Sequence, residues 1–401
     1  MSRSRRGDGV RRIAILAVAA AALVVAATAA ARTSAGSPIV IGWAHDSTGP
    51  MAPFDGPALA AAQIRVAQIN AKGGVDGHPL AIKTCDTQGD NPAVSKTCAD
   101  KLIAGGAKVI FTTCDVDLAA PVVQESINKG LLTIAPCIGT DQMGPKRFGA
   151  KGALAFSFGN VAQDEGSAMA QFAWAKGWRT ADLATDTVIV YFKNVVQAFA
   201  ARWKQLGGKI VDQETYQDPA FHGNNVQNAV SRINSHQADV IVTSTAGAYG
   251  ALAPLITGLR TLGNNTPVLN SWAGDGVYWL PKSPKVTNYY FVTYADAFGG
   301  DPNAAINALA KKIHAATGGF VTGPAAIDGL ATAIREAGGS TNGAALAAKM
   351  VTFHHVPTLS GLVTFSPQLH SVFHRQYRVI EINNNVPRLV AEVVAKVVPK
   401  I

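Results

Sequence analysis

The chain has 401 residues, of which 48% are hydrophobic and 15% are charged. This composition excludes a wholly disordered chain, and the length allows two or three domains with sizeable cores. Lys and Arg exceed Asp and Glu by 35 to 26, and a net charge of +9 would suggest a nucleic-acid partner if it were spread over the whole protein.

The N-terminus has the pattern of an export signal. Five arginines precede an uncharged run, residues 13–31, that is rich in Ala and Val and ends in Ala29-Ala30-Ala31. A positive segment, an apolar segment and small residues at a cut site are typical of a secretory signal peptide. An uncleaved membrane anchor is the alternative. We favour cleavage after residue 31, because an Ala-rich run is only weakly hydrophobic.

Removal of residues 1–31 changes the meaning of the charge. This segment carries five Arg and one Asp, so its loss lowers the net charge from +9 to +5. The remaining charge forms no basic stripe, and we therefore expect no nucleic-acid partner. The predicted location is the periplasm, reached by secretion across the inner membrane.

The first lobe is predicted from short apolar strands that alternate with amphipathic helices. Asn91-Pro92 supplies a helix cap followed by a first-turn proline, and Gly73-Gly74 and Gly105-Gly106 act as helix stops. This alternation is typical of a parallel sheet covered on both faces. The expected strands are 39–42, 80–84, 109–112 and 131–135, and the helices between them contain residues 59–69, 92–104 and 121–129.

Four cysteines lie in this first lobe, at Cys85, Cys98, Cys114 and Cys137. An even number in an exported protein predicts two disulfides, with three connectivities open. We prefer Cys85–Cys98 and Cys114–Cys137, because each pair then joins neighbouring elements. No C-x-x-C motif is present, which argues against a thioredoxin motif or a zinc ribbon. Four buried thiols are the alternative if the protein is not exported.

The strand–helix pattern restarts after a join near residues 156–161, which predicts a second similar lobe. Residues 289–294 form a strand that returns towards the first lobe, and a third crossing is expected near residues 360–366, because residues 377–383 form a strand without an adjacent helix. The predicted fold class is therefore α/β, with two doubly wound parallel-sheet lobes joined by a three-strand hinge. The predicted segments are a signal peptide (1–31), lobe 1 (32–157), lobe 2 (158–284), a return segment of lobe 1 (285–362) and a C-terminal segment of lobe 2 (363–401).

The sequence contains none of the common catalytic motifs. It has no G-x-G-x-x-G, G-x-x-x-x-G-K-[ST], G-x-S-x-G or H-E-x-x-H. His370 and His374 have helical spacing, but the residues between them favour a strand or turn, so we do not assign them as metal ligands. We expect no enzyme activity, no cofactor and no metal.

In open parallel sheets, ligands bind beyond the carboxyl ends of the strands. The loops at those ends of the two predicted lobes hold aromatic and acidic residues, including Tyr191, Tyr249 and Trp272. This mixture is richer than turns alone require, and it favours a binding site between the lobes.

Three segments carry a resemblance to a known family. Ser47-Thr48-Gly49-Pro50, then the run INAKGGVDG at 69–77 and the run CDTQGDNP at 85–92, closely resemble type I periplasmic solute-binding proteins of branched-chain amino-acid ABC transporters, the leucine/isoleucine/valine-binding protein family. The resemblance implies two lobes that close on a small ligand, an amino acid, amide or related compound, and deliver it to the membrane subunits of an ABC permease. We expect a monomer.

The resemblance also implies the ligand contacts. Asp275 matches the carboxylate that faces the ligand ammonium, Phe54 matches an aromatic residue over the ligand side chain, and Asp186 and Tyr191 match second-lobe contacts. The candidate ligand-binding residues are Ser47, Thr48, Phe54, Asp115, Asp117, Gly139, Thr140, Asp186, Tyr191, Trp272 and Asp275.

One part of the pattern departs from the family. Its amino-acid binders hold the ligand carboxylate with a serine and a threonine, whereas this chain has Asp115 and Asp117 near the serine position and Gly139 or Thr140 near the threonine. An Asp facing a ligand carboxylate would repel it, which argues against a leucine-like ligand.

Structural roles remain open for several candidates. Asp115, Asp117 and Asp186 could cap helices, Asp275 could belong to a turn, and Trp272 could pack the lobes together. Two other functions also remain: a sensor or receptor subunit of the same fold and, with less support, an exported hydrolase.

Overall fold

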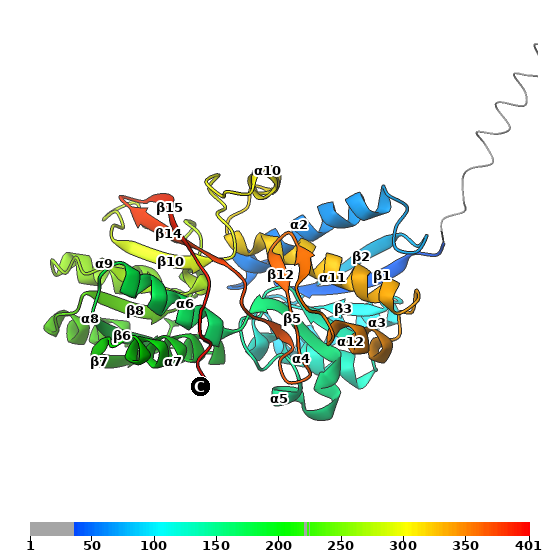
Figure 1. Ribbon diagram of the computed structural model, residues 1–401, viewed down its shortest axis with the longest axis horizontal. Helices are drawn as coiled ribbons and strands as arrows, with labels where there is room; N and C mark the ends of the chain where they lie inside the picture. The colour runs from blue at the N-terminus through cyan, green and yellow to red at the C-terminus, as the bar shows by residue number, and fades with distance from the viewer. Residues whose placement is uncertain (1–35, 220–222, 224) are drawn as a thin grey trace, which may run out of the picture.

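The computed structural model describes residues 36–219, 223 and 225–401. The predicted signal peptide, residues 1–31, lies outside the described residues. The described chain forms two lobes side by side, each built on its own sheet with helices around it (Figure 1). This confirms the predicted two-lobe α/β architecture. Within the described residues, no helix is both long and apolar enough to cross a bilayer.

Lobe 1 contains a six-stranded sheet in the order β13-β5-β4-β3-β1-β2, with every pairing parallel. Helices α2, α11 and α12 pack on one face, and α3 and α4 pack on the other. Because both faces are covered, β3 and β4 are buried along their whole length. The strands are β1 (Ile39–His45), β2 (Leu80–Asp86), β3 (Val109–Phe111), β4 (Leu132–Ala135), β5 (Ala155–Asn160) and β13 (Ser371–Val372), and the helices are α2 (Ala52–Asn70), α3 (Pro92–Ala104), α4 (Val116–Asn128), α5 (Pro145–Phe148), α10 (Ala304–Ile313), α11 (Thr322–Glu336) and α12 (Gly343–Met350).

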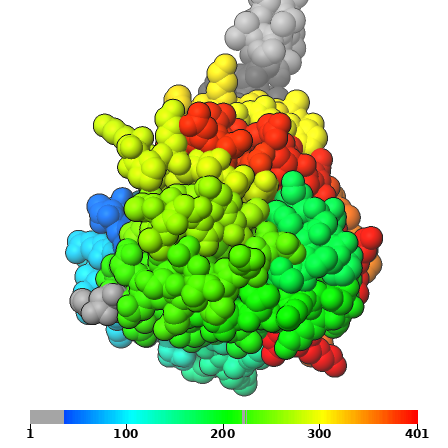
Figure 2. Space-filling view, turned by 90° about the vertical axis from the view of Figure 1, so that its left-hand side faces the viewer, coloured from blue at the N-terminus to red at the C-terminus, as the bar shows by residue number. Residues whose placement is uncertain are grey.

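Lobe 2 contains a seven-stranded sheet in the order β15-β14-β10-β9-β8-β6-β7. Figure 2 shows its outer end, where the red C-terminal segment lies along one edge of the green body. The two C-terminal strands run antiparallel, because residues 384 and 385, both Asn with positive φ, form a two-residue hairpin. The strands are β6 (Thr180–Asp186), β7 (Lys209–Tyr216), β8 (Val240–Ser244), β9 (Val268–Asn270), β10 (Tyr289–Thr293), β14 (Tyr377–Asn383) and β15 (Val386–Val393), and the helices are α6 (Ala162–Ala175), α7 (Val190–Gln205), α8 (Val226–Ser235) and α9 (Leu252–Thr261).

The chain crosses between the lobes after β5, β10 and β13. These places differ from the predicted boundaries at residues 157, 284 and 362. β10 pairs with β9 and β14, so it belongs to the sheet of lobe 2, whereas the sequence places 285–362 in lobe 1. The segment around 360–366 is not a crossing, because β11 (Val356–Thr358) and β12 (Gly361–Val363) form a hairpin there. A buried apolar strand fits either sheet, so its pattern does not reveal which one it joins.

Arg375 ties the crossing segments together. It is buried, its Nε donates to Asn160 Oδ1 at 2.7 Å, and its Nη2 donates to the Phe158 carbonyl at 2.5 Å. The guanidinium also lies 4.8 Å from the centre of the Tyr294 ring, which follows β10. The Arg375 side chain, which lies in the third crossing segment, thus contacts residues of the other two crossing segments. This network marks the hinge.

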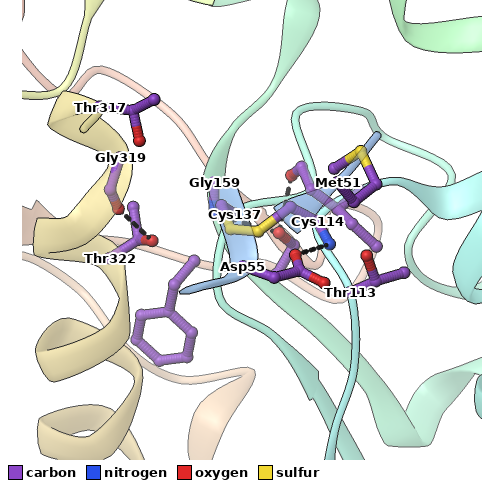
Figure 3. The surroundings of a disulfide bond; sticks show 12 residues. Met51, Asp55, Thr113, Cys114, Cys137, Gly159, Thr317, Gly319 and Thr322 are labelled. Carbon is purple, nitrogen blue, oxygen red and sulfur yellow. Dashed lines mark hydrogen bonds between the residues drawn. A yellow bond between two sulfur atoms is a disulfide. The ribbon is translucent and has the colours of Figure 1, made fainter. Parts of the chain in front are cut away.

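Both predicted disulfides are present. Cys85–Cys98 joins β2 to α3, and Cys114–Cys137 joins the loops that follow β3 and β4, with Cα atoms 5.5 and 4.8 Å apart. Cys114 of the second bridge lines a cavity between the lobes, and Figure 3 shows this bridge close to Asp55 and Gly159. The second bridge therefore fixes two loops at the edge of lobe 1 that faces lobe 2.

Removing the second bridge is expected to destabilise the protein. It closes a segment of 23 residues, and loss of that constraint in a Cys114→Ala/Cys137→Ala variant should lower the free energy of unfolding by about 3 kcal/mol. Urea denaturation measures this, with Cys85→Ala/Cys98→Ala as the matched variant for the 13-residue segment. Recovery of four free thiols in non-reducing peptide mapping would contradict both pairings.

Candidate functional site

A cavity of about 20 Å³ lies between the lobes, at the carboxyl ends of strands from both sheets. This volume holds roughly one water molecule, so a solute of several non-hydrogen atoms enters only when the lobes separate. Larger hollows, of about 510 and 600 Å³, lie among the outer helices and not at the carboxyl ends of the strands. Lobe 1 contributes Met51, Phe54, Cys114 and Asp115 to the cavity, and lobe 2 contributes Ile189, Tyr191, Phe192, Ala246, Tyr249, Trp272 and Ala273.

Aromatic rings from both lobes surround this cavity. Trp272 lies at the centre of the group: the Phe54 ring of lobe 1 meets it edge-on at 5.0 Å, and the Tyr191 ring lies 6.4 Å away. On its other side Trp272 stacks on Tyr294 at 5.1 Å. The structure thus brings three predicted contacts, Phe54, Tyr191 and Trp272, into one cluster. Trp272 also packs the lobes together, as the alternative interpretation proposed.

Asp115 both caps a helix and lines the cavity. Its Oδ1 accepts hydrogen bonds from the backbone N–H groups of Asp117 and Leu118, at 2.8 and 3.1 Å, so it is the N-cap of α4. Burial, and secondarily the charge of Asp117, raises the pKa of Asp115 to about 7. The capping interpretation is therefore correct, and it does not exclude contact with a solute.

Asp117 forms a bond between the lobes. One carboxylate oxygen pairs with Arg147 at 2.6 Å, and the other accepts the backbone N–H of Val190 at 2.8 Å. Val190 is the first residue of α7 in lobe 2, so a carboxylate of lobe 1 satisfies a free N–H at the start of a helix in lobe 2. Asp117 does not line the cavity. We call this hydrogen bond between Asp117 and Val190 the latch, because it joins the two lobes across the cleft.

Loss of this latch is expected to favour the open form. An Asp117→Ala variant should shift the equilibrium between closed and open forms by about 1–2 kcal/mol, because one charge-assisted hydrogen bond between the lobes disappears. Hydrogen exchange at the Val190 amide should accelerate about tenfold, and small-angle scattering should show a larger radius of gyration. Asp100→Ala, which removes an exposed ion pair with Lys96 in lobe 1, is the matched control. Unchanged exchange at Val190 would rule out the latch.

Glu165 is a site residue that the sequence interpretation missed. The Tyr191 hydroxyl donates to both of its carboxylate oxygens, at 2.8 and 2.9 Å, and the Trp272 backbone N–H donates to Oε1 at 2.6 Å. Burial raises the pKa of Glu165 to about 8. One side chain in the first turn of α6 therefore positions two of the aromatic residues at the cavity. The sequence signal that could have identified Glu165 was its position directly after the predicted join between the lobes at residues 156–161.

Asp186 and Asp275 are held by the protein itself and do not line the cavity. Asp186 accepts from the Thr245 hydroxyl at 2.9 Å and from the Val188 N–H at 3.2 Å. Asp275 Oδ2 accepts from the Thr293 hydroxyl and the Gly318 N–H, both at 2.6 Å. Burial raises the pKa of each carboxyl to about 7. Asp275 thus stabilises the contact of lobe 2 with the return segment.

The remaining candidates lie apart from the cavity lining. Ser47 is exposed, and its hydroxyl donates to Asp86 at 2.5 Å, while the N–H of exposed Thr48 donates to Asp46. Buried Gly139 lies directly under the Tyr191 ring, which leaves no room for a side chain there. The carbonyl of buried Thr140 accepts from Ser371 at 2.6 Å. These residues shape lobe 1 around the cavity.

Carboxylates of lobe 1 already bind the backbone donors at its cleft edge. Asp55 accepts from the N–H groups of Asp46 and Cys114, at 2.9 and 3.0 Å, and Figure 3 shows its bond to Cys114 beside the disulfide. Burial, with the nearby charge of Asp90, holds the pKa of Asp55 well above its usual range. Asp46 accepts the N–H groups of Thr48, Gly49, Met51 and Gly89.

The two candidate histidines do not form a pair. His370 is buried, stacks on Phe156 at 4.1 Å and bonds the Ala155 carbonyl, whereas His374 is half exposed beside Asp164. Among the described residues, a group with suitable spacing for a metal ion is formed by Asp212, Glu214 and His236. It lies on the edge strand β7 and at the end of α8, away from the carboxyl edge of the sheet.

Comparisons with known proteins agree with this architecture. A family model described as "Periplasmic binding protein" matches residues 38–387. Leu/Ile/Val-binding protein BraC3 of Rhizobium johnstonii is 27% identical over 333 residues, which cover 82% of this chain and 87% of that protein. Leu/Ile/Val-binding protein homolog 3 of Brucella melitensis is 26% identical over 338 residues, with the same two coverages.

Solved structures share the fold. The branched-chain amino acid transporter substrate-binding protein LivJ of Streptococcus pneumoniae, in complex with isoleucine, superimposes with a TM-score of 0.74 at 18% identity, over 89% of this chain and 99% of that one. A solute-binding protein of an ABC transporter from Rhodopseudomonas palustris, in complex with 3,4-dihydroxybenzoic acid, gives a TM-score of 0.73 at 15% identity, over 90% and 99%. At these identities the likeness shows the fold alone.

Proposed function

The chain belongs to the periplasmic binding protein family, whose members are substrate-binding proteins of transporters and not enzymes, and from this we propose that it captures a small solute between its lobes and delivers it to an ABC permease. In this proposal the protein is exported by its N-terminal signal and acts as a monomer in the periplasm. The solute is small and polar: an amino acid, an amide or a related compound.

The observation that carries the proposal is the position of the cavity. It lies at the carboxyl ends of both sheets, residues of both lobes line it, and the chain passes between the lobes in crossing segments that meet at the hinge around Arg375. A solute that contacts both lobes gains those contacts only in the closed form, so its binding shifts the population towards closure. The permease then recognises the closed form.

A solute panel tests the proposal. The mature protein is heated with amino acids, amides, amines and small carboxylates in turn, and a solute at 100 times its Kd should raise Tm by about 3–4 °C. Mass spectrometry of the same mixtures should show the solute unchanged. Well-folded protein that responds to no solute would contradict solute capture, and turnover of a solute would favour a hydrolase.

Delivery needs its own measurement. Deletion of the gene should lower cellular uptake of the solute found in the panel, and expression of the intact chain should restore it. Uptake that is unchanged by the deletion would favour a sensor subunit over transport.

A further inference from the structure

We infer that the solute is a small organic cation that carries no carboxylate group. This inference rests on the proposed function, because it takes the cavity between the lobes as the solute site. Three features carry it: the aromatic rings around the cavity, the carboxylate that lines it, and the backbone donors of lobe 1 that its own carboxylates already occupy.

The cavity is lined mainly by aromatic rings. Tyr191 and Phe192 lie 5.9 Å apart at the start of α7, Tyr249 lies 5.8 Å from Phe192, and Phe54 and Trp272 close the other side at 5.0 Å. Each ring presents a negative face or a positive edge, and groups of such rings bind ammonium and quaternary ammonium ions through their faces. Because the rings come from both lobes, they surround a solute only when the lobes come together, and the cavity of about 20 Å³ must widen to hold it.

Asp115 places a carboxylate at the same cavity. Capping α4 does not require a charge, since Asn91 caps α3 of the same lobe through two bonds of the same kind, to Ala93 and Val94 at 3.0 and 3.2 Å. Only Oδ1 of Asp115 accepts the capping hydrogen bonds, so Oδ2 takes no part in the cap. None of the eleven residues that line the cavity is basic. One carboxylate oxygen of Asp115 thus remains outside the cap, at a cavity whose lining holds no basic residue, and a cation fits there.

Three backbone donors at this edge of lobe 1 are already taken. The N–H groups of Cys114, Asp117 and Leu118, which follow β3, already donate to the carboxylates of Asp55 and Asp115. A second carboxylate would also lie against Asp115 in a desolvated site, where repulsion between like charges is strong. Amino acids in their ordinary zwitterionic form are thus disfavoured, and amines or quaternary ammonium compounds are favoured.

Matched probes separate charge from shape. Choline, its neutral isostere 3,3-dimethylbutan-1-ol and its carboxylated counterpart glycine betaine are titrated into the mature protein by calorimetry, together with ethanolamine, agmatine and leucine. We expect at least one of the three cations, choline, ethanolamine or agmatine, to bind. If choline binds, its affinity should exceed that of its neutral and carboxylated counterparts about tenfold or more. If no cation binds, or if a neutral or carboxylated compound binds as tightly as the best cation, the inference is wrong.

Asp115→Asn is the matched variant, because an Asn side chain preserves the cap that Asn91 makes in α3. It should keep the Tm of the parent and lose about tenfold or more in affinity for the cation. Asp100→Asn, at an exposed site in lobe 1, should change neither. Equal affinity of Asp115→Asn and parent would overturn the inference. If leucine or betaine binds and closes the lobes, solute capture stands while the cation inference falls; if none of these compounds or the panel solutes binds, both fall.

Discussion

A Gly139→Val variant is expected to fold normally and to bind its solute about 100-fold more weakly. A Cβ atom at Gly139 would lie 2.6 Å from Cε2 and 3.0 Å from Cδ2 of the Tyr191 ring. Tyr191 cannot easily move away, because its hydroxyl is bonded to buried Glu165. Gly139 belongs to lobe 1 and Tyr191 to lobe 2, so the clash with the ring arises when the lobes close, whereas the 3.3 Å contact of the Cβ atom with the Asn160 carbonyl of lobe 1 is milder and present in both forms. A closed form that costs about 2.7 kcal/mol more corresponds to the 100-fold loss.

Calorimetry with the strongest solute of the panel measures the affinity, and small-angle scattering should show that the variant stays open in its presence. Gly56→Val is the matched control, since Gly56 is exposed in α2 and a Cβ there meets no atom within 4 Å. A second change, Tyr191→Ala, should relieve the clash and let the double variant close again. Wild-type affinity in Gly139→Val would contradict closure at this contact.

A Glu165→Ala variant is expected to lower the free energy of unfolding by about 4 kcal/mol. The Tyr191 hydroxyl and the Trp272 N–H would lose their acceptor inside the protein, and each buried unsatisfied group costs about 1–3 kcal/mol. Glu165→Gln keeps the size of the side chain and an acceptor oxygen, so we expect it to cost less than about 1 kcal/mol. Urea denaturation compares the two variants. Equal loss in both would contradict the assignment of this stabilisation to the hydrogen bonds of Glu165.

The pH dependence of stability follows from the same burial. Burial raises the pKa of Glu165 from 4.5 to about 8, so the folded protein holds a proton that the unfolded chain releases between these values. Its contribution to stability is therefore fully present below about pH 4.5 and is lost as pH rises through 8. Buried Asp115, Asp186 and Asp275, with pKa values near 7, act in the same direction.

Denaturation at a series of pH values should show a free energy of unfolding that falls between pH 5 and pH 8. Glu165→Gln should flatten the upper part of this decline. A stability that rises over this interval would contradict the burial of these carboxyl groups.

Much of the fold was predictable because its elements carry local signals. The Asn91-Pro92 cap begins α3 as expected, and α3 ends at Ala104, directly before the predicted stop at Gly105-Gly106. What the sequence could not provide was the partner of each strand. The apolar run Tyr289–Thr293 is equally suited to either lobe, and its place in lobe 2 depends on hydrogen bonds to residues far along the chain.

The site was predictable in outline but not in orientation. The loops were located from the ends of the strands, yet Asp46 captures the N–H groups of its own loop and turns Thr48 to solvent. Asp117 reaches across to Val190, a contact set by the relative position of the lobes. Glu165 was passed over because an acidic residue in the first turn of a helix is ordinary. Each of these outcomes depends on tertiary contacts that spacing does not record.

The crystal structure of the mature protein with the strongest solute of the panel tests the central claim most directly. Solute capture predicts the solute between the lobes, in contact with Phe54 of lobe 1 and with Tyr191 and Trp272 of lobe 2, and lobes that lie further apart in crystals grown without it. A solute bound in one of the outer hollows, or lobes in the same relative position with and without solute, would contradict it.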